Sequence, residues 1–215
     1  MNPKLVIFDM DGTISNSKDG IFFSYRHVAD VLGKPQPTLE QLNMSLGGSL
    51  QSNIQRLYDL DDSEVQNAVF IYRDEYSAKG ESLVVPFDGI KECINDLVSK
   101  NIIVSIATLK VAEFAVKLMV DWKMEKLFRS IQGADYEGRL TKADLIRACM
   151  KDADAEPSET VMIGDSMDDL NSARECGVHF IGAAYGFSLP EERCISEGVS
   201  FARSPVEIPD VILRI

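Results

Sequence analysis

The chain has 215 residues, of which 45% are hydrophobic, enough for one substantial core and a smaller second unit. Its formal net charge of -12 argues against DNA or RNA as a partner, because non-specific affinity for nucleic acid comes from clustered Lys and Arg. The four apolar residues before Asp9 are too few for a signal sequence or a membrane span. We therefore expect a cytoplasmic protein with no nucleic-acid partner and no membrane partner. Monomer and homodimer are both left open.

The first part of the chain combines one strand with a long helical segment. Residues 5–8 are consecutive apolar residues, which is typical of a buried parallel strand. Residues 16–85 contain long helical stretches, with capping-box candidates that start at Thr38 and Ser63, and no convincing strand. Because this insert begins directly after the loop that follows the first strand, we expect it to lie over the carboxyl edge of the sheet.

The rest of the chain alternates between strands and helices. Apolar runs predict further strands at residues 102–107, 128–132, 160–163 and 178–181, and helical spacing predicts helices at 91–100, 111–120 and 140–150. This alternation predicts an α/β fold, a doubly wound parallel sheet formed by residues 1–15 and 86–215, with residues 16–85 as an inserted helical domain. The tail from Ser188 onward carries no clear pattern.

Two carboxylates follow the first strand. Asp9 comes directly after residues 5–8, Asp11 lies two positions later, and Gly12 allows the backbone to turn away. One carboxylate of such a pair can coordinate a hard cation and act as a nucleophile, and the other can exchange a proton with the leaving oxygen. The alternative is an ordinary strand that ends in an Asp-Gly turn.

Two candidate anion-binding groups come later in the chain. Thr108 ends the second strand at an expected helix start, where unpaired amides and the helix dipole favour an anion. Lys142 lies in the expected first turn of a helix capped by Thr141, where a cation is unfavourable unless an anion lies nearby. The alternatives are a plain helix cap and a solvated lysine. Their position relative to the strand ends favours the phosphate-binding interpretation.

A further acidic group follows the strand at residues 160–163. Asp165 and Asp169 are four positions apart, so they share a face if a helix starts at the turn made by Gly164, and they can then approach one cation together. The alternative is a run of acids that stabilises a helix start. The glycine at the turn favours the metal interpretation.

These motifs occur in a fixed order at the ends of different strands. Together they resemble the motifs of the haloacid dehalogenase (HAD) superfamily, in its phosphatase branch: Asp9-Met10-Asp11-Gly12-Thr13, Thr108, Lys142 and Gly164-Asp165-x-x-x-Asp169. The resemblance spans residues 5 to about 186, and the layout is most similar to the phosphoglycolate phosphatase group. It implies a Rossmann-like core with a helical cap inserted after the first motif.

The resemblance also implies an activity, that of a phosphomonoester hydrolase acting on a small phosphorylated metabolite through an aspartyl-phosphate. Asp9 is implied to be the nucleophile and Asp11 the general acid/base. Thr108 and Lys142 are implied to bind the substrate phosphate.

A magnesium site is implied as well. The implied ligands of Mg²⁺ are Asp9, the backbone carbonyl of Asp11, and Asp165. Asp169 and Gly164 are implied to support this site. The cation would explain how an acidic protein handles phosphate, because it neutralises the carboxylates.

Three positions depart from the pattern of the phosphoglycolate phosphatase group: Asn16, Leu109 and Ala143 stand where Asp, Asn and Pro are usual. They leave the chemistry intact but weaken a precise substrate assignment. The alternatives are a β-phosphoglucomutase-type phosphomutase, a pyrophosphatase or nucleotidase on the same core and, from another class, a non-catalytic binding protein. The intact acidic residues argue against the last.

A glycine pair marks the middle of the helical insert. Gly47 and Gly48 join two helical stretches, and paired glycines permit close backbone approach to a ligand. The segment resembles the cap loop that reaches into the site in phosphoglycolate-phosphatase-like proteins. The alternative is a flexible turn between helices.

Overall fold

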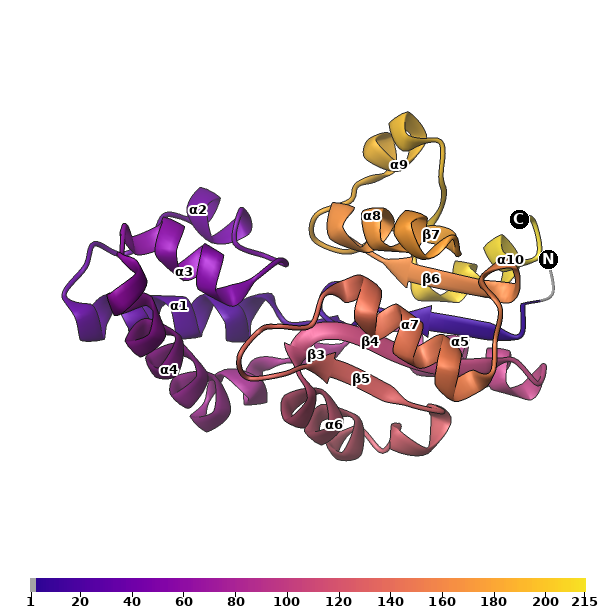
Figure 1. The fold of residues 1–215 in the computed structure, drawn as a ribbon, viewed down its shortest axis with the longest axis horizontal. Coiled ribbons are helices and arrows are strands. Elements are labelled where there is room, and N and C mark those ends of the chain that lie inside the picture. The colour runs from indigo at the N-terminus through magenta and orange to yellow at the C-terminus, as the bar shows by residue number, and fades with distance from the viewer. Residues whose placement is uncertain (1–2) are drawn as a thin grey trace. The chain divides into compact units, whose positions relative to one another are not determined.

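The computed structural model describes residues 3–215, which form two compact units (Figure 1). One unit joins the segment that ends at Ser15 to Pro86–Ile215, and the other is Asn16–Val85. The chain passes between the units in two short strands, β2 (Ser15–Asn16) and β3 (Val85–Pro86), which pair with each other. No helix within residues 3–215 has both the length and the apolar character needed to cross a membrane.

The larger unit is built on a six-stranded parallel sheet of order β5-β4-β1-β6-β7-β8. Its strands, in chain order, are β1 (Leu5–Phe8), β4 (Ile103–Val111), β5 (Ile131–Ala134), β6 (Thr160–Gly164), β7 (His179–Ala183) and β8 (Ser200–Ala202). The predicted α/β fold class is thus confirmed. Strand β8 was not predicted, because its three residues are too few to show a period.

Helices connect and cover these strands. They are α5 (Ile90–Ser99), α6 (Ala112–Asp121), α7 (Lys142–Ala153), α8 (Met167–Cys176), α9 (Glu191–Glu197) and α10 (Ile208–Ile212), with 3-10 turns at Glu125–Leu127, Pro157–Glu159 and Pro205–Glu207. Leu5 and Ile7 of β1 pack with Ile146 of α7 and Leu170 of α8 in one buried cluster. Because side chains alternate along a strand, Val6 and Phe8, also fully buried, face the opposite side of the sheet.

The order of the strands places a topological switch at β1. This strand lies between β4 and β6, and Phe8 at its end pairs with Ile106 on one side and Ile163 on the other. The chain moves outward from β1 through β4 and β5, then crosses to β6 on the other side. In open α/β sheets the residues that follow the strands at such a point meet in one place, which is where ligands bind.

The expected helix start at Thr108 is wrong. Strand β4 continues to Val111, and α6 begins only at Ala112, without a side-chain cap. Thr108 and Val111 both still pair with β5, and a register shift between them marks a bulge. The neighbouring strand therefore holds Thr108 in extended backbone, and its hydroxyl does not cap a helix.

The smaller unit is helical, with α1 (Lys18–Leu32), α2 (Leu39–Asn43), α3 (Leu50–Tyr58), α4 (Asp62–Ala78) and a 3-10 turn at Gly80–Leu83. The capping box at Thr38 is confirmed, with Gln41 as its reciprocal partner. The one predicted at Ser63 is wrong. Asp61 caps α4 instead, because its carboxylate accepts from the backbone N–H groups of Ser63 and Glu64 and satisfies two of the helix's open donors.

Candidate active site

Asp9 is the first residue after β1, in the middle of the sheet. Its backbone N–H donates to the carbonyl of Ile163 at 2.8 Å, which continues the ladder between β1 and β6 by one residue. Its side chain is buried, and its Oδ1 lies 2.5 Å from Nζ of Lys142. The sheet itself therefore fixes the position of the candidate nucleophile.

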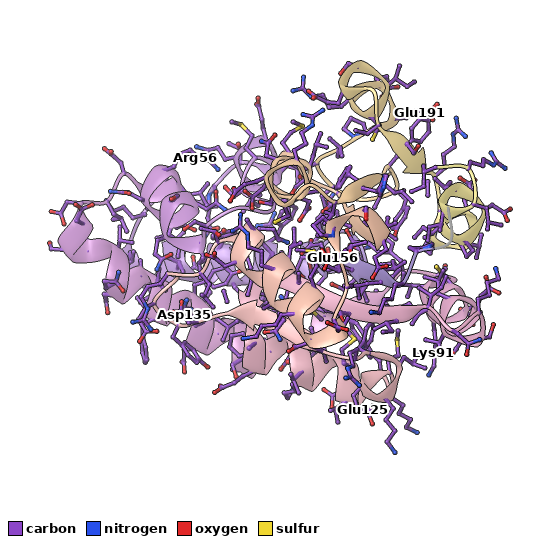
Figure 2. All side chains as sticks on the ribbon, turned by 45° about the vertical axis from the view of Figure 1, so that its right-hand side comes forward. Arg56, Lys91, Glu125, Asp135, Glu156 and Glu191 are labelled. Carbon is purple, nitrogen blue, oxygen red and sulfur yellow. The ribbon has the colours of Figure 1, made fainter. Side chains whose placement is uncertain are left out.

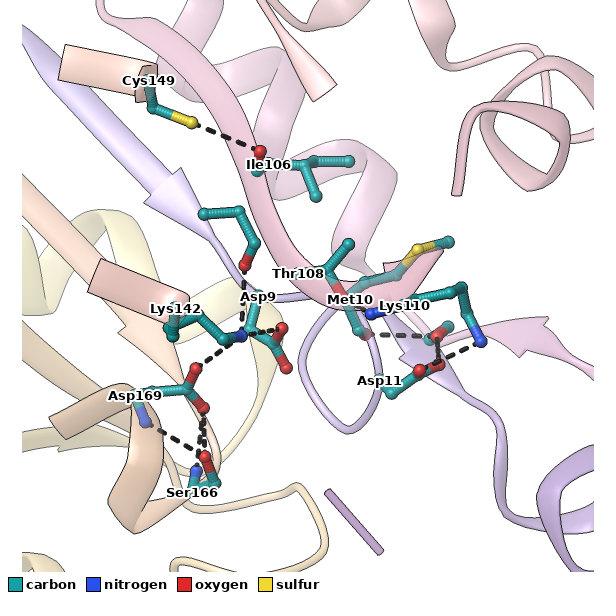
Figure 3. Close-up of polar contacts among 12 residues, drawn as sticks. Asp9, Met10, Asp11, Ile106, Thr108, Lys110, Lys142, Cys149, Ser166 and Asp169 are labelled. Carbon is teal, nitrogen blue, oxygen red and sulfur yellow. Dashed lines mark hydrogen bonds and ion pairs between the residues drawn. The ribbon is translucent and has the colours of Figure 1, made fainter. Parts of the chain in front are cut away.

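Lys142 is the first residue of α7, as the sequence predicts, and Thr141 caps this helix in a capping box with Asp144. Besides Asp9, its ammonium contacts Oδ1 of Asp169 at 2.8 Å and the carbonyl of Ala107 at 3.2 Å (Figure 3). The contacts with Asp9 and Ala107 are hydrogen bonds, and the contact with Asp169 is an ion pair. Lys142 is thus held in one place at the edge of the sheet.

Asp165 and Asp169 approach Asp9, although by a different route from the one predicted. Helix α8 begins at Met167 with Ser166 as its cap, so Asp165 lies outside the helix and the helical spacing does not unite the two acids. The turn after β6 brings them together instead. One ligand atom from each of Asp9, Asp165 and Asp169 lies within 4.8 Å of the others.

The two acids after β6 have different partners. Oδ2 of Asp169 accepts from the N–H of Ser166 at 3.1 Å and from its hydroxyl at 2.6 Å, while its Oδ1 faces Lys142. Asp169 thus orients Lys142 and completes the capping box that begins at Ser166. Oδ2 of Asp165 accepts from the N–H of Phe187 at 2.7 Å. Within residues 3–215, no hydrogen bond engages Oδ1 of Asp165 or Oδ2 of Asp9.

Two glycines allow this crowding. A Cβ on Gly164 would lie 2.5 Å from Cβ and Cγ of Asp169, and one on Gly12 would lie 2.1 Å from Oδ2 of Asp165. Gly12 also has a φ of +86°, which other residues rarely adopt. The glycines of the two motifs are therefore required by the close approach of backbone to carboxylate.

Burial dominates the electrostatics of the cluster. It raises the pKa of Asp9 to about 7, with Lys142 opposing the rise and Asp169 adding to it. Burial, followed by the charges of Asp9 and Asp169, raises the pKa of Asp165 well above its usual value. Burial alone would lower the pKa of Lys142, but the charges of Asp169 and Asp9 outweigh it and the pKa is raised. Three carboxylates around one ammonium leave an excess of negative charge.

The donor set fits a hard divalent cation. Every candidate ligand atom is a carboxylate oxygen, the type that Mg²⁺ prefers, and Asp9 and Asp165 each keep one oxygen without a hydrogen bond among residues 3–215. A cation there would lower the cost of ionising the buried acids.

Asp11 points away from the cluster of Asp9, Lys142 and Asp169 (Figure 3). Its Oδ2 lies 3.0 Å from Nζ of Lys110, whose side chain is 7% exposed, and its Oδ1 accepts from the hydroxyl of Ser15 at 3.2 Å. The sequence did not indicate Lys110 as a site residue. The missing signal is the continuation of β4 past Thr108, which keeps Lys110 at the same edge of the sheet as Thr108.

Thr108 lies on the opposite side of β1 from Asp165, at the pairing of β4 with β5. It is buried, and its hydroxyl oxygen accepts from the backbone N–H of Lys110 at 3.1 Å. Its hydroxyl hydrogen can still be donated to an anion.

The glycine pair of the helical unit lies in an ordered loop. Gly47 and Gly48 have φ values of +78° and +70°, a conformation that glycine adopts without strain and most other residues avoid. The Asn53 side chain donates to the carbonyl of Gly47 at 2.8 Å, and Arg56, labelled in Figure 2, donates to the carbonyl of Met44 at 2.7 Å. Two side chains of α3 therefore hydrogen-bond to the backbone of this loop.

Known proteins are similar to this chain in sequence and in fold. Residues 6–183 match the family model described as haloacid dehalogenase-like hydrolase. The chain is 31% identical to a 5'-nucleotidase of Pseudomonas aeruginosa over 188 residues, covering 87% of this chain and 85% of that protein. It is 27% identical to a phosphoglycolate phosphatase of Pseudomonas putida over 195 residues, covering 86% and 71%. A crystal structure of a predicted phosphatase from Clostridium acetobutylicum matches with a TM-score of 0.92 at 28% identity, covering 100% of both chains.

The α/β sheet with acidic groups at its switch point defines a hydrolase of the HAD type. The chain belongs to the haloacid dehalogenase-like hydrolase family, which confirms the resemblance seen in its motifs.

Proposed function

We propose that this enzyme is a magnesium-dependent phosphomonoester hydrolase that works through an aspartyl-phosphate on Asp9. The observation that carries the proposal is the buried carboxylate of Asp9, held by the sheet, 2.5 Å from the ammonium of Lys142 and beside Asp165. A carboxylate fixed next to a cationic group can attack a phosphorus atom whose oxygens that group binds.

The proposed reaction has two steps. In the first, a carboxylate oxygen of Asp9 bonds to phosphorus, the bond to the substrate's ester oxygen breaks, and Asp11 donates a proton to that oxygen as the alcohol leaves. In the second, Asp11 takes a proton from a water molecule that attacks the same phosphorus. The bond to Asp9 then breaks, and inorganic phosphate is released.

Lys142 and Thr108 are proposed to bind the non-bridging oxygens of the phosphate. Lys142 supplies a fixed positive charge, which Asp169 and the carbonyl of Ala107 hold in place, and Thr108 supplies its hydroxyl hydrogen. Because Asp169 and the carbonyl of Ala107 keep Lys142 in place, its contact with Asp9 can be exchanged for one with a phosphate oxygen, and the ammonium then stabilises the transferring phosphoryl group.

Asp9, Asp165 and the backbone carbonyl of Asp11 are proposed to hold Mg²⁺, with Asp169 in support. The cation, when bound, neutralises the carboxylates and the phosphate dianion, which otherwise repel each other. The excess of acids over ammonium groups around Asp9 supports this assignment.

Removal of the metal is expected to abolish turnover. Treatment with EDTA should reduce phosphate release to background, because the buried acids repel the substrate phosphate when no cation neutralises them. Added Mg²⁺ should restore the activity. Calcium should inhibit, since it favours more and longer oxygen contacts than an octahedral site offers. The measurement is release of inorganic phosphate from p-nitrophenyl phosphate. Full activity in EDTA, or equal rates with calcium and magnesium, would contradict the assignment.

A small phosphorylated metabolite is the proposed substrate, with phosphoglycolate as the first candidate. The phosphoglycolate phosphatase of Pseudomonas putida supports it, and the 5'-nucleotidase of Pseudomonas aeruginosa makes nucleoside 5'-monophosphates the second candidate. A screen of phosphate esters for magnesium-dependent phosphate release separates the two. The catalytic efficiency, kcat/KM, decides between them.

The helical unit, residues 16–85, is proposed to be a cap that closes over the site and selects the substrate through its Gly47–Gly48 loop. A lid of this kind excludes water and contacts the group that leaves. The ordered loop, fixed by Asn53 and Arg56, supports this role.

Bulk at the loop should therefore affect substrates unequally. Gly48→Asn adds a side chain at a position with positive φ that asparagine tolerates. A valine at this position would strain the backbone, so its effect on activity would be harder to interpret. We expect kcat/KM for the physiological substrate to fall by roughly tenfold, with a smaller loss on p-nitrophenyl phosphate. Gly33→Asn is the matched control, since Gly33 has a φ of +63° and ends α1. Equal losses on both substrates, or none, would place substrate selection elsewhere.

A further inference from the structure

A short loop after the last strand of the matched family region packs against the acidic site. Residues 185–187 follow β7 and precede α9, just beyond residues 6–183 that match the family model. The Tyr185 hydroxyl donates to the carbonyl of Thr13 at 2.8 Å, and the N–H of Phe187 donates to Oδ2 of Asp165 at 2.7 Å. The loop therefore contacts both the turn after Asp9 and the acid after β6.

Gly186 brings the loop into direct contact with Asp165. A Cβ at this position would lie 2.4 Å from Cβ of Asp165 and 2.4 Å from the carbonyl oxygen of Gly12. A Cβ on Gly12 would also meet this carboxylate, 2.1 Å from Oδ2. Asp165 thus packs closely against two stretches of backbone, with no room for a side chain on either.

Aromatic packing anchors the loop. The ring of Phe87 meets Tyr185 edge to face, with centroids 5.1 Å apart, and lies 6.3 Å from the ring of Phe187. The N–H of Phe87 donates to the carbonyl of Ile14 at 3.0 Å. Phe87 and the Tyr185 hydroxyl therefore both hydrogen-bond to the turn at residues 13–14, so the loop and this turn pack together.

We infer that residues 185–187 are a positioning element for Asp165. The amide of Phe187 engages Oδ2, which fixes the carboxylate plane and leaves Oδ1 available as a cation ligand. The Tyr185 hydroxyl ties this arrangement to the turn that carries Asp9 and Asp11. The three residues act through Asp165 and do not touch the substrate. The inference rests on the proposed magnesium site and adds the residues that preorganise it.

The test is magnesium binding by the whole protein, measured by isothermal titration calorimetry without substrate. Gly186→Ala should raise the Kd for Mg²⁺ by about tenfold or more, the scale typical of lost support behind a metal ligand. Gly182→Ala is the matched control: its Cβ would lie 2.4 Å from Sγ of Cys194, at the end of β7 and against a different neighbour. This control should lower Tm and leave the Kd unchanged.

A second, milder variant, Tyr185→Phe, keeps the inference testable if Gly186→Ala does not fold. Tyr185→Phe keeps the ring packed on Phe87 and removes only the hydrogen bond to Thr13, so it should fold and raise the Kd a few-fold. An unchanged Kd in Tyr185→Phe and Gly186→Ala, or an equal rise in Gly182→Ala, would overturn the inference while the magnesium site stands. Failure of the wild-type protein to bind Mg²⁺ would overturn the metal site together with the inference, so the two failures are distinguishable.

Discussion

Asp9→Asn is expected to retain less than a few per cent of wild-type turnover on every substrate. The change keeps the shape of the side chain and removes the attacking charge, so no covalent intermediate can form by the normal route. The fold should survive, because burial already disfavours the ionised form of Asp9. Lys142 also keeps Asp169 and the carbonyl of Ala107 as partners.

The measurement is kcat with p-nitrophenyl phosphate, alongside a thermal melt. Asp168→Asn is the control, since Asp168 is an exposed acid of the same motif and lies next to Asp169. It should keep wild-type activity. An Asp9→Asn enzyme that retains more than a few per cent of the wild-type rate, while still folded, would rule out Asp9 as the nucleophile.

Asp11→Asn is expected to slow turnover by about a hundredfold or more, the usual scale for lost general acid/base help. An amide cannot deliver a proton to the leaving alcohol or take one from water. The loss in the first step should be milder for p-nitrophenyl phosphate, because p-nitrophenolate leaves without a proton.

Single-turnover rates isolate that first step. They should be measured for Asp11→Asn with p-nitrophenyl phosphate and with an alkyl phosphate, each as a ratio to the wild-type rate. Ser15→Ala is a useful control, because it removes the 3.2 Å hydrogen bond to Asp11 and keeps the carboxyl group itself. It should cost much less than Asp11→Asn. Equal losses for good and poor leaving groups in Asp11→Asn would argue against a proton-donor role.

Most of the core fold could be predicted because its strands are buried on both faces. Residues 5–8 and 161–163 are continuous apolar runs, which are typical of strands in a parallel sheet covered on both faces. The start of α7 at Lys142 could be predicted because its capping box, Thr141 with Asp144, involves only residues that are close in sequence.

The features that sequence reasoning missed depend on contacts between distant segments. The end of β4 is set by pairing with β5, which lies about twenty residues later in the chain. Local sequence alone therefore predicts a helix start at Thr108 and does not indicate Lys110 as a site residue. The approach of Asp165 to Asp169 depends on a turn outside α8 and not on helical spacing. The role of Gly186 depends on Gly12, which lies at the other end of the chain.

The covalent intermediate on Asp9 can be trapped and identified directly. Asp11→Asn should lack the base for the second step, so p-nitrophenyl phosphate should phosphorylate it faster than water can release the phosphate. Acid quenching during turnover, followed by proteolysis and mass spectrometry, should then show one phosphoryl group on the peptide that contains Asp9. The same treatment of the Asp9→Asn, Asp11→Asn double variant should show none. A phosphoryl group on another residue, or none on Asp11→Asn while it turns over substrate, would contradict the account.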